Sequence, residues 1–388
     1  LDQSLTITRE IGNRRGEAGT LGNLGSAYMV LGDAQQAIKY HERSLAIWRE
    51  IGDRHGTAND LGNLGNAFLH LGDLKRAIEF YEQSLELHRE IGDRHGEGKN
   101  LANLADVHRQ LGNGQRAIGL YEQCLELHRN IGDRVGEGDD LGKLGIMHAQ
   151  LGDARKAIEY FEQRVIIARE TGDQKEEGNA LGNLGIAHAS LGNVNQAIEY
   201  FEKNLEITRA ARDAMGECLT LRHLGRAYQD FGTRYRDMHH FVHALDCFQQ
   251  GLDIAQANKI RKLEAEIMWD MAVLESALGN STRALALAQQ AAVIYSQMGR
   301  MEEFQTMQKL IAMIQDGDVS VNPRAQNMQE VFQAFLDAGS LDEMRAIVGR
   351  FPFMQETDFI EYVAQFIKER VRSEDKPAFQ QRLAWLKQ

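Results

Sequence analysis

Three side chains that can bind a metal ion stand close together after residue 235. His239, His243 and Cys247 are spaced at i, i+4 and i+8, so they share one face if a helix starts early there. Imidazole and thiolate are zinc ligands, but a tetrahedral site needs a fourth ligand, and only Asp237 is near. The alternative is that Cys247 packs in a core beside solvated histidines. The three residues are therefore a weak metal candidate, and no cofactor is expected.

Glycine-rich stretches raise a second chemistry, which is phosphate binding. LGNLGSAYMVLGD at residues 21–33 and LGNLGNAFLHLGD at residues 61–73 each hold three glycines. A phosphate loop needs a preceding strand and a G-x-G-x-x-G or G-x4-G-K-[ST] pattern, and LGNLG supplies neither. We also find no nucleophile beside a general base, and no paired carboxylates outside faces expected to be solvated. The sequence therefore predicts a protein that is not an enzyme.

The glycines belong to a repeat of forty residues. Leucine recurs without gaps at Leu21, Leu61, Leu101, Leu141, Leu181 and Leu221, and again at Leu24, Leu64, Leu104, Leu144, Leu184 and Leu224. The next column is Gly25, Gly65, Ala105, Gly145, Gly185 and Gly225, followed by Tyr28, Phe68, His108, His148, His188 and Tyr228. The second half of the unit holds Ala37, Ala77, Ala117, Ala157 and Ala197, then His41, Tyr81, Tyr121, Phe161 and Phe201. Apolar residues at i, i+3, i+4 and i+7 predict two amphipathic helices in each unit.

The pattern L-x2-L-G-x2-[YFH] followed by A-x3-[FYH] resembles the tetratricopeptide repeat (TPR). The resemblance implies an all-α, right-handed superhelical solenoid of antiparallel helix pairs over residues 1–315. Leucine replaces the usual tryptophan, and arginine replaces the closing proline at Arg49, Arg89, Arg129, Arg169 and Arg209. Without proline the second helix can run on, which accounts for the forty-residue length. This longer form is similar to the repeats of LGN/Pins adaptors, kinesin light chains and bacterial TPR-containing signalling NTPases.

Three roles are expected for the repeated glycines. Those before an acidic residue, such as Gly32 before Asp33, suit a left-handed helix end and the N-cap that follows. The column of Gly25 should mark the closest approach of two paired helices. The column of Gly22 lies on the first helix, which in the family lines the concave groove, so these glycines are expected to open its floor. His108, His148 and His188 occupy the aromatic core position and are expected to be packed.

The domain boundaries follow from the register. The chain begins inside a repeat, so we expect a half repeat at the start and an upstream domain of the same polypeptide. Seven residues are inserted near residues 233–243, which we interpret as a protruding loop that touches a ligand or partner. After about seven units, residues 316–388 lose the repeat and contain all three prolines, and we interpret them as a C-terminal helical cap.

A column of asparagines in the first helices is the main candidate binding feature. It comprises Asn23, Asn63, Asn103 and Asn183, with Lys143 and His223 in the other two units. In LGN-like and kinesin-light-chain-like repeats, asparagines at this position bind the backbone of an extended peptide, for which an amide supplies both donor and acceptor. The alternative is that they contact the neighbouring repeat or water.

Variable positions of the same helices would set selectivity. The candidates are Asn66, Asp106, Arg109, Ile146, Ile186, Arg222 and Arg226. The isoleucines predict an apolar middle, and Arg222, His223 and Arg226 predict a basic end, which would suit a ligand with an apolar anchor and an acidic group. The alternative is ordinary drift of exposed residues. Recurrent charges such as Glu50 with Arg54 and Glu90 with Arg94 are expected to form exposed pairs.

Composition narrows the class of partner. The 388 residues carry a net charge of −12, which argues against nucleic acid as a main partner. Three scattered cysteines suggest a reducing compartment, so a cytoplasmic location is expected. No apolar run approaches the length of a membrane span, and no membrane association is predicted.

Three functions compete on this basis. The first is a protein- or peptide-binding module that holds a partner segment in its concave groove. The second is a ligand-sensing, autoinhibitory C-terminal region of a bacterial signalling or defence NTPase. The third is an oligomerisation scaffold, which predicts self-association.

Overall fold

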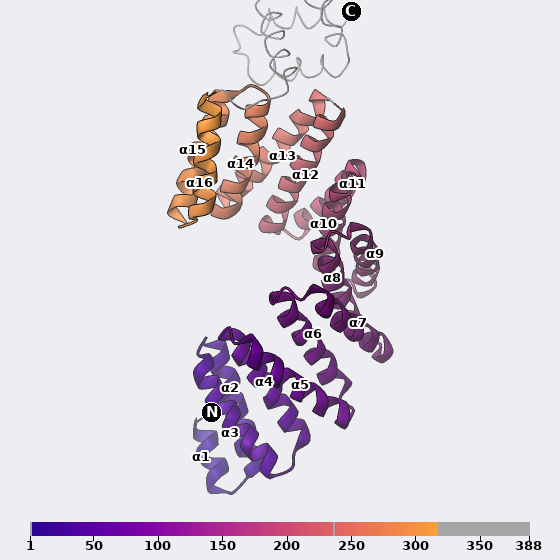
Figure 1. Cartoon of the computed structure of the whole chain (residues 1–388), viewed down its shortest axis with the longest axis vertical. Helices are drawn as coiled ribbons and strands as arrows, with labels where there is room; N and C mark the ends of the chain where they lie inside the picture. The colour runs from indigo at the N-terminus through magenta and orange to yellow at the C-terminus, as the bar shows by residue number, and fades with distance from the viewer. Residues whose placement is uncertain (1, 236, 317–388) are drawn as a thin grey trace, which may run out of the picture. The chain divides into compact units, whose positions relative to one another are not determined.

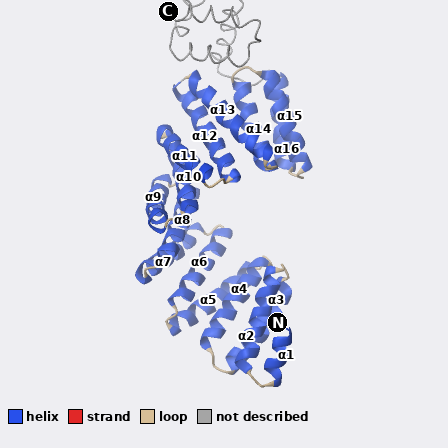
Figure 2. Cartoon of the chain, turned by 180° about the vertical axis from the view of Figure 1, so that it is seen from behind, coloured by secondary structure: helices blue, strands red, loops and turns tan. Residues whose placement is uncertain are grey.

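The structure, a computed structural model, describes residues 2–235 and 237–316. These residues form sixteen α-helices joined by short turns, with no strand among them (Figure 2). The helices are α1 (Asp2–Glu10), α2 (Arg14–Val30), α3 (Ala34–Glu50), α4 (Arg54–His70), α5 (Leu74–Ile91), α6 (Arg94–Gln110), α7 (Gly114–Ile131), α8 (Arg134–Gln150), α9 (Ala154–Thr171), α10 (Gln174–Ser190), α11 (Val194–Ala210), α12 (Ala214–Tyr235), α13 (Met238–Ala257), α14 (Arg261–Ala277), α15 (Ser281–Gln297) and α16 (Met301–Asp316). The all-α class predicted from the periodicity is confirmed.

Consecutive helices fold back on one another in pairs (Figure 1). We call the first helix of each pair A and the second B. The A helices are α2, α4, α6, α8, α10, α12 and α14, and the B helices are α3, α5, α7, α9, α11, α13 and α15. The described residues fall into two compact units, one of residues 1–173 and one that starts at Gln174. In the first unit α2 contacts α4 and α4 contacts α6, so successive A helices form a common face.

The turns have the predicted chemistry. Gly32 has φ of +80°, in the left-handed region that glycine adopts without strain. Asp33 then caps α3, and its Oδ1 accepts a 3.0 Å hydrogen bond from the backbone N–H of Gln36. The same side-chain cap is formed by Asp53, Asp73, Asp93, Asp133 and Asp153. The B helices run through the position of the family's proline, as the sequence predicted.

The column of Gly25 holds the closest approach within each pair, also as predicted. A Cβ atom at Gly65 would lie 2.6 Å from the ring of Tyr81, and one at Gly145 would lie 2.5 Å from the ring of Phe161. Such distances are too short for carbon atoms, so the aromatic side chain of the B helix packs directly on the A-helix backbone.

The expected role of the Gly22 column is wrong. A Cβ at Gly62 would meet Ser84 at 3.3 Å and Asn100 at 3.5 Å, so this glycine faces its own B helix and the next A helix. These glycines therefore allow helices to pack closely, and they do not open the floor of a groove.

Histidines at the aromatic position are packed where the prediction placed them. His148 stacks on Tyr160 and His188 on Tyr200, with ring centroids 5.4 and 5.2 Å apart, and both histidines are buried. His108 is half-buried.

The insertion is helical, which corrects the expected protruding loop. It extends α12 to Tyr235 and lets α13 begin at Met238, three residues after α12 ends. Asp237 caps α13, since its Oδ1 accepts a 2.9 Å hydrogen bond from the N–H of His239. The predicted C-terminal cap lies outside the described residues, apart from Asp316 at the end of α16.

Candidate functional site

Tyrosines of the B helices reach the A helices of the first unit. The hydroxyl of Tyr81 donates a 2.7 Å hydrogen bond to Oδ1 of Asn66, and that of Tyr121 donates one of 2.7 Å to Oδ1 of Asp106. Both tyrosines are buried, and the ring of Tyr81 packs against Gly65, next to Asn66 on the A helix. Burial, with the charge of Asp106, raises the pKa of Tyr81, and the phenol stays a donor at neutral pH.

Five of the predicted binding residues form two sets of contacts. Asn103 Nδ2 lies 3.5 Å from Oδ1 of Asn66, at the limit of a hydrogen bond. Asp106 forms ion pairs with two cations: its Oδ1 lies 3.6 Å from Arg109 Nη2, and its Oδ2 lies 3.7 Å from Lys143 Nζ. These contacts run from α4 through α6 to α8. The structure therefore brings together residues that the sequence placed only by register.

The other asparagines of the column are free of internal partners. Within residues 2–235 and 237–316, the amides of Asn23, Asn63 and Asn183 make no hydrogen bond to another side chain or to the backbone. Asn23 is exposed, whereas Asn63 and Asn183 are half-buried. Asn103 thus follows the neighbouring-repeat alternative, and the remaining three have amide groups available to a ligand or to water.

The predicted apolar middle is divided between the two units. Ile146 of α8 is 38% exposed in the first unit, and Ile186 of α10 is 44% exposed in the second. Each isoleucine is thus available for contact on its own unit.

The predicted basic end is neutralised, which corrects the expectation of free positive charge there. Arg226 binds Asp270 through two hydrogen bonds, from Nη2 to Oδ1 at 2.7 Å and from Nε to Oδ2 at 3.0 Å. Arg222 donates to the same carboxylate at 2.6 Å and also binds Glu266. Both acids come from the A helix α14, which follows the insertion and therefore lies outside the unbroken forty-residue register.

His223 lies inward, beside these arginines. Its ring stacks on Phe201, with centroids 5.5 Å apart. Burial lowers the pKa of His223 to about 4, and the neighbouring charges of Arg222 and Arg226 act in the same direction. His223 is therefore a neutral packed side chain in a column otherwise held by polar groups.

The weak metal candidate in the insertion does not assemble. Cys247 is 7% exposed and packs in the core with Phe201 and Leu221, which is the alternative weighed from the sequence. Burial raises the pKa of Cys247 to about 12. His239 and His243 stack edge to face, with ring centroids 4.2 Å apart.

In the described part of the chain, one group of potential metal ligands does converge. It consists of Cys124, His128 and Asp140, whose ligand atoms all lie within 4.8 Å of one another. The spacing Cys124-x3-His128 places both side chains on one face of a helix and is a signal already present in the sequence. Asp140 comes from the next helix, across a turn, and could not be assigned from spacing.

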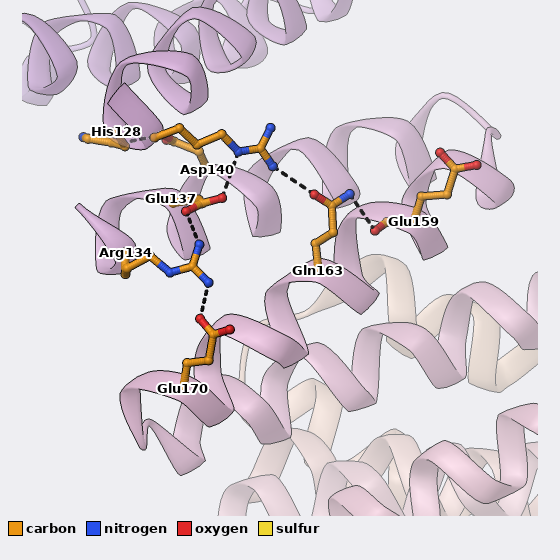
Figure 3. A network of polar contacts seen from close by, with 8 residues as sticks. His128, Arg134, Glu137, Asp140, Glu159, Gln163 and Glu170 are labelled. Atoms are coloured by element: carbon orange, nitrogen blue, oxygen red, sulfur yellow. Dashed lines mark hydrogen bonds and ion pairs between the residues drawn. The ribbon is translucent and has the colours of Figure 1, made fainter. Parts of the chain in front are cut away.

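A polar seam crosses the turns between repeats (Figure 3). Arg129 Nε and Arg134 Nη1 each bind one oxygen of Glu137, at 2.8 and 2.5 Å, and Arg134 also binds Glu170. Equivalent clamps hold Glu17 and Glu97. The arginine that replaces the family's proline, such as Arg129, is thus one of the two arginines that bind each glutamate.

The predicted pairing of neighbouring charges is wrong. Glu50 binds Arg14 and Glu90 binds Arg54, each 36 residues earlier, because a turn separates Glu50 from Arg54 and removes the helical spacing. Arg94 instead binds Glu97.

These features define a helical-repeat protein whose successive A helices carry a mixed polar and apolar surface. The tetratricopeptide repeat family model matches residues 16–90, 99–170 and 176–257, and the chain belongs to this family. Solenoid repeats present extended surfaces for binding, and the chain is a protein-interaction module of this class. A comparison with curated protein sequences finds no match. None of the described helices is both long and apolar enough to cross a membrane.

Solved structures share the fold at low sequence identity. A Signal Transduction ATPase with Numerous Domains (STAND) protein with a tetratricopeptide repeat sensor from Pyrococcus horikoshii is 17% identical, with a TM-score of 0.61 over 78% of this chain and 46% of that one. Aspartyl phosphate phosphatase F from Bacillus subtilis is 15% identical, with a TM-score of 0.53 over 75% of this chain and 73% of that one. BtubC from P. vanneervenii is 19% identical, with a TM-score of 0.51 over 58% and 92%.

Proposed function

We propose that the A helices of the chain bind an extended segment of another protein. The observation that carries the proposal is the set of internally unpaired amides at Asn23, Asn63 and Asn183. They hold the same register in three repeats, two in the first unit and one in the second. The half-buried amides of Asn63 and Asn183 favour a partner that can both donate and accept. A peptide backbone offers such groups at regular intervals.

Selectivity in this proposal comes from the residues around Asp106. Arg109 and Lys143 outnumber the single carboxylate that they share, which leaves one net positive charge. Ile146 follows Lys143 by three residues on α8 and is exposed, so a cation and an apolar contact lie side by side. A segment with an apolar side chain near an acidic one fits this surface.

The second unit supplies a corresponding surface in this proposal. Asn183 and Ile186 lie on α10, again three residues apart. Of the two paired arginines, Arg226 has a side chain that is 49% exposed, so a ligand would reach it more easily than Arg222, at 14%. A ligand there would contact an arginine that is already bound to Asp270, so this pair offers the ligand little net charge.

A peptide-display experiment tests this function. Random peptides displayed on phage are selected on the chain, and the affinity of the best peptide is measured by fluorescence anisotropy. The double variant Asn23→Ala with Asn63→Ala removes two unpaired amides of the first unit and should weaken binding at least about tenfold, which corresponds to about 1.4 kcal/mol. Gln83→Ala, an exposed amide on the B helix α5, is the matched control and should bind normally. Equal affinity of all three proteins would remove the asparagine column from the mechanism.

A second candidate function is a sensor array attached to a nucleotide-binding switch. The STAND protein, whose repeats are named as its sensor, favours this alternative, since the array matches about half of that longer chain. In that case ligand binding would shift the switch between two states. The test is to extend the coding sequence upstream and search for a Walker motif, then compare ATP hydrolysis with and without the array. Faster hydrolysis without the array would support autoinhibition, and the lack of a Walker motif would refute it.

A further inference from the structure

Three side chains of different chemistry meet between α7 and α8. Cys124 and His128 lie one turn apart on α7, and Cys124 Sγ is 3.7 Å from His128 Nδ1. Asp140 of α8 places Oδ2 2.6 Å from the same nitrogen. Cys124 is fully buried and Asp140 is 2% exposed, whereas the His128 side chain is 12% exposed, so the imidazole lies at the edge of this buried position.

The geometry argues against a nucleophilic cysteine. A catalytic triad places the nucleophile and the carboxylate on opposite nitrogens of the imidazole, so that a proton can pass through the ring. Here Cys124 and Asp140 both face Nδ1 of His128. Burial also raises the pKa of the Cys124 thiol well above its usual range. Three donor atoms around one point are instead the arrangement of a metal site.

We propose that Cys124, His128 and Asp140 bind one Zn²⁺ ion. Sulfur, nitrogen and oxygen donors together are the ligand set that Zn²⁺ accepts, at bonds of about 2.0–2.3 Å. Three protein ligands leave the fourth tetrahedral position to a water molecule. Donor atoms of a tetrahedral site with such bonds lie about 3.3–3.6 Å apart, so the Cys124–His128 distance already fits. The His128–Asp140 distance must open by about 0.7 Å as the ion replaces their hydrogen bond.

Charge balance favours a divalent ion in this buried position. The thiolate of Cys124 and the carboxylate of Asp140 carry two negative charges, which the ion cancels, and binding releases the thiol proton to solvent. His128 binds as the neutral imidazole with its proton on Nε2, and that nitrogen lies 3.9 Å from Oδ2 of Asp133. At 3.9 Å this contact is longer than a hydrogen bond, so the Asp133 carboxylate acts on the ring only as a nearby charge. Lys143, whose positive charge acts on both Cys124 and Asp140, is paired with Asp106.

The surroundings of the site make room for the imidazole. A Cβ at Gly98 would lie 2.9 Å from Nε2 of His128, and one at Gly136 would lie 2.8 Å from its Cγ. The ring therefore fits between two glycines, one on α6 and one on α8. A bound ion would join α7 to α8 and thus tie one repeat to the next.

The chain itself provides conservative variants for a test. The residues forty positions before Cys124 and Asp140 are Ser84 and Asn100. Ser84 Oγ donates to the carbonyl of Ala58, as Cys124 Sγ does to that of Gly98, so Cys124→Ser should preserve packing. Asp140→Asn likewise reproduces a side chain that the fold accepts. Cys218→Ser is the control, because Cys218 is also buried and donates to a carbonyl but has no such neighbours.

The experiment uses the untagged 388-residue chain and Zn²⁺ in competition with a chromophoric chelator. We expect one tightly held ion per chain, with affinity reduced at least about tenfold in Cys124→Ser and in Asp140→Asn and unchanged in Cys218→Ser. Replacing Zn²⁺ with Co²⁺ should give a thiolate-to-metal charge-transfer band that disappears in Cys124→Ser alone among the two cysteine variants. Circular dichroism checks that each variant is folded.

Two results would overturn the proposal. One is the absence of stoichiometric Zn²⁺ binding by the wild-type chain. The other is binding that persists in folded Cys124→Ser with unchanged affinity, which would place the ion elsewhere.

Discussion

Nε of Arg129 donates a 2.8 Å hydrogen bond to Oε1 of Glu137, across the turn that joins α7 to α8. Arg134 binds the other oxygen of the same carboxylate. Burial acts to raise the pKa of Glu137, but the two arginines outweigh it and hold that pKa below its usual range. The folded state therefore gains stability from the ionised form, present above about pH 4.5 and lost as the pH falls through the lower, folded value.

Removal of this carboxylate should destabilise the first unit. Glu137→Ala leaves Arg129 and Arg134 without their shared partner, and we expect the free energy of unfolding to fall by about 2 kcal/mol at pH 7. Urea denaturation measures the change. Glu126→Ala, an exposed position on α7, should alter stability by less than about 0.5 kcal/mol. Equal effects of the two substitutions would show that the clamp contributes nothing specific.

Two glycine-to-alanine substitutions in the first unit should have opposite signs. Gly145→Ala places a Cβ 2.5 Å from Phe161, so the helices must separate, at a cost of about 1–3 kcal/mol. Gly119→Ala on α7 meets no atom within 4 Å and should stabilise the helix by about 0.5–1 kcal/mol. Thermal unfolding compares the two, and stabilisation by Gly145→Ala would contradict the close-packing account.

His223 should make the stability of the second unit depend on pH. The pKa of His223 is about 4 in the folded state and near 6.5 when unfolded, so the unfolded chain binds the proton first. Stability is complete above pH 6.5 and should decline by up to about 3 kcal/mol as the pH falls toward 4. His223→Asn introduces the residue that four other repeats have at this position. It should reduce the difference between the free energies of unfolding measured at pH 7 and pH 5. An unchanged difference would rule out His223 as its source.

The two partners of the Arg226–Asp270 pair should respond unequally to truncation. Asp270→Ala removes the carboxylate that binds Arg222, whose side chain is only 14% exposed, and we expect a loss of about 3 kcal/mol. Arg226→Ala removes a half-exposed side chain while Arg222 still binds the carboxylate, so the loss should be below about 1 kcal/mol. Hydrogen exchange in α12 and α14 compares the local stability of the two variants. Similar losses of stability would show that Asp270 needs Arg226 as well as Arg222 as an ion-pair partner.

Much of the local structure could be predicted from the sequence. The forty-residue period located the helix pairs, and the residue types at turns such as Gly32-Asp33 located their ends, because backbone conformation and capping depend on neighbours within a few residues. The close approach of paired helices at Gly65, against Tyr81, could also be predicted, because both residues belong to one repeat.

The partners of charged and polar side chains depended on the tertiary structure. Arg226 was expected to be a free cation, yet Asp270 binds it from a helix 44 residues later. Glu90 was assigned to Arg94 and binds Arg54, and Cys124 with His128 meets Asp140 only after the chain turns from α7 into α8. Periodicity and capping are local properties that the sequence by itself determines. The position of an ion pair or a ligand set depends on how successive repeats stack, because long side chains reach whichever opposite charge the stacking brings near.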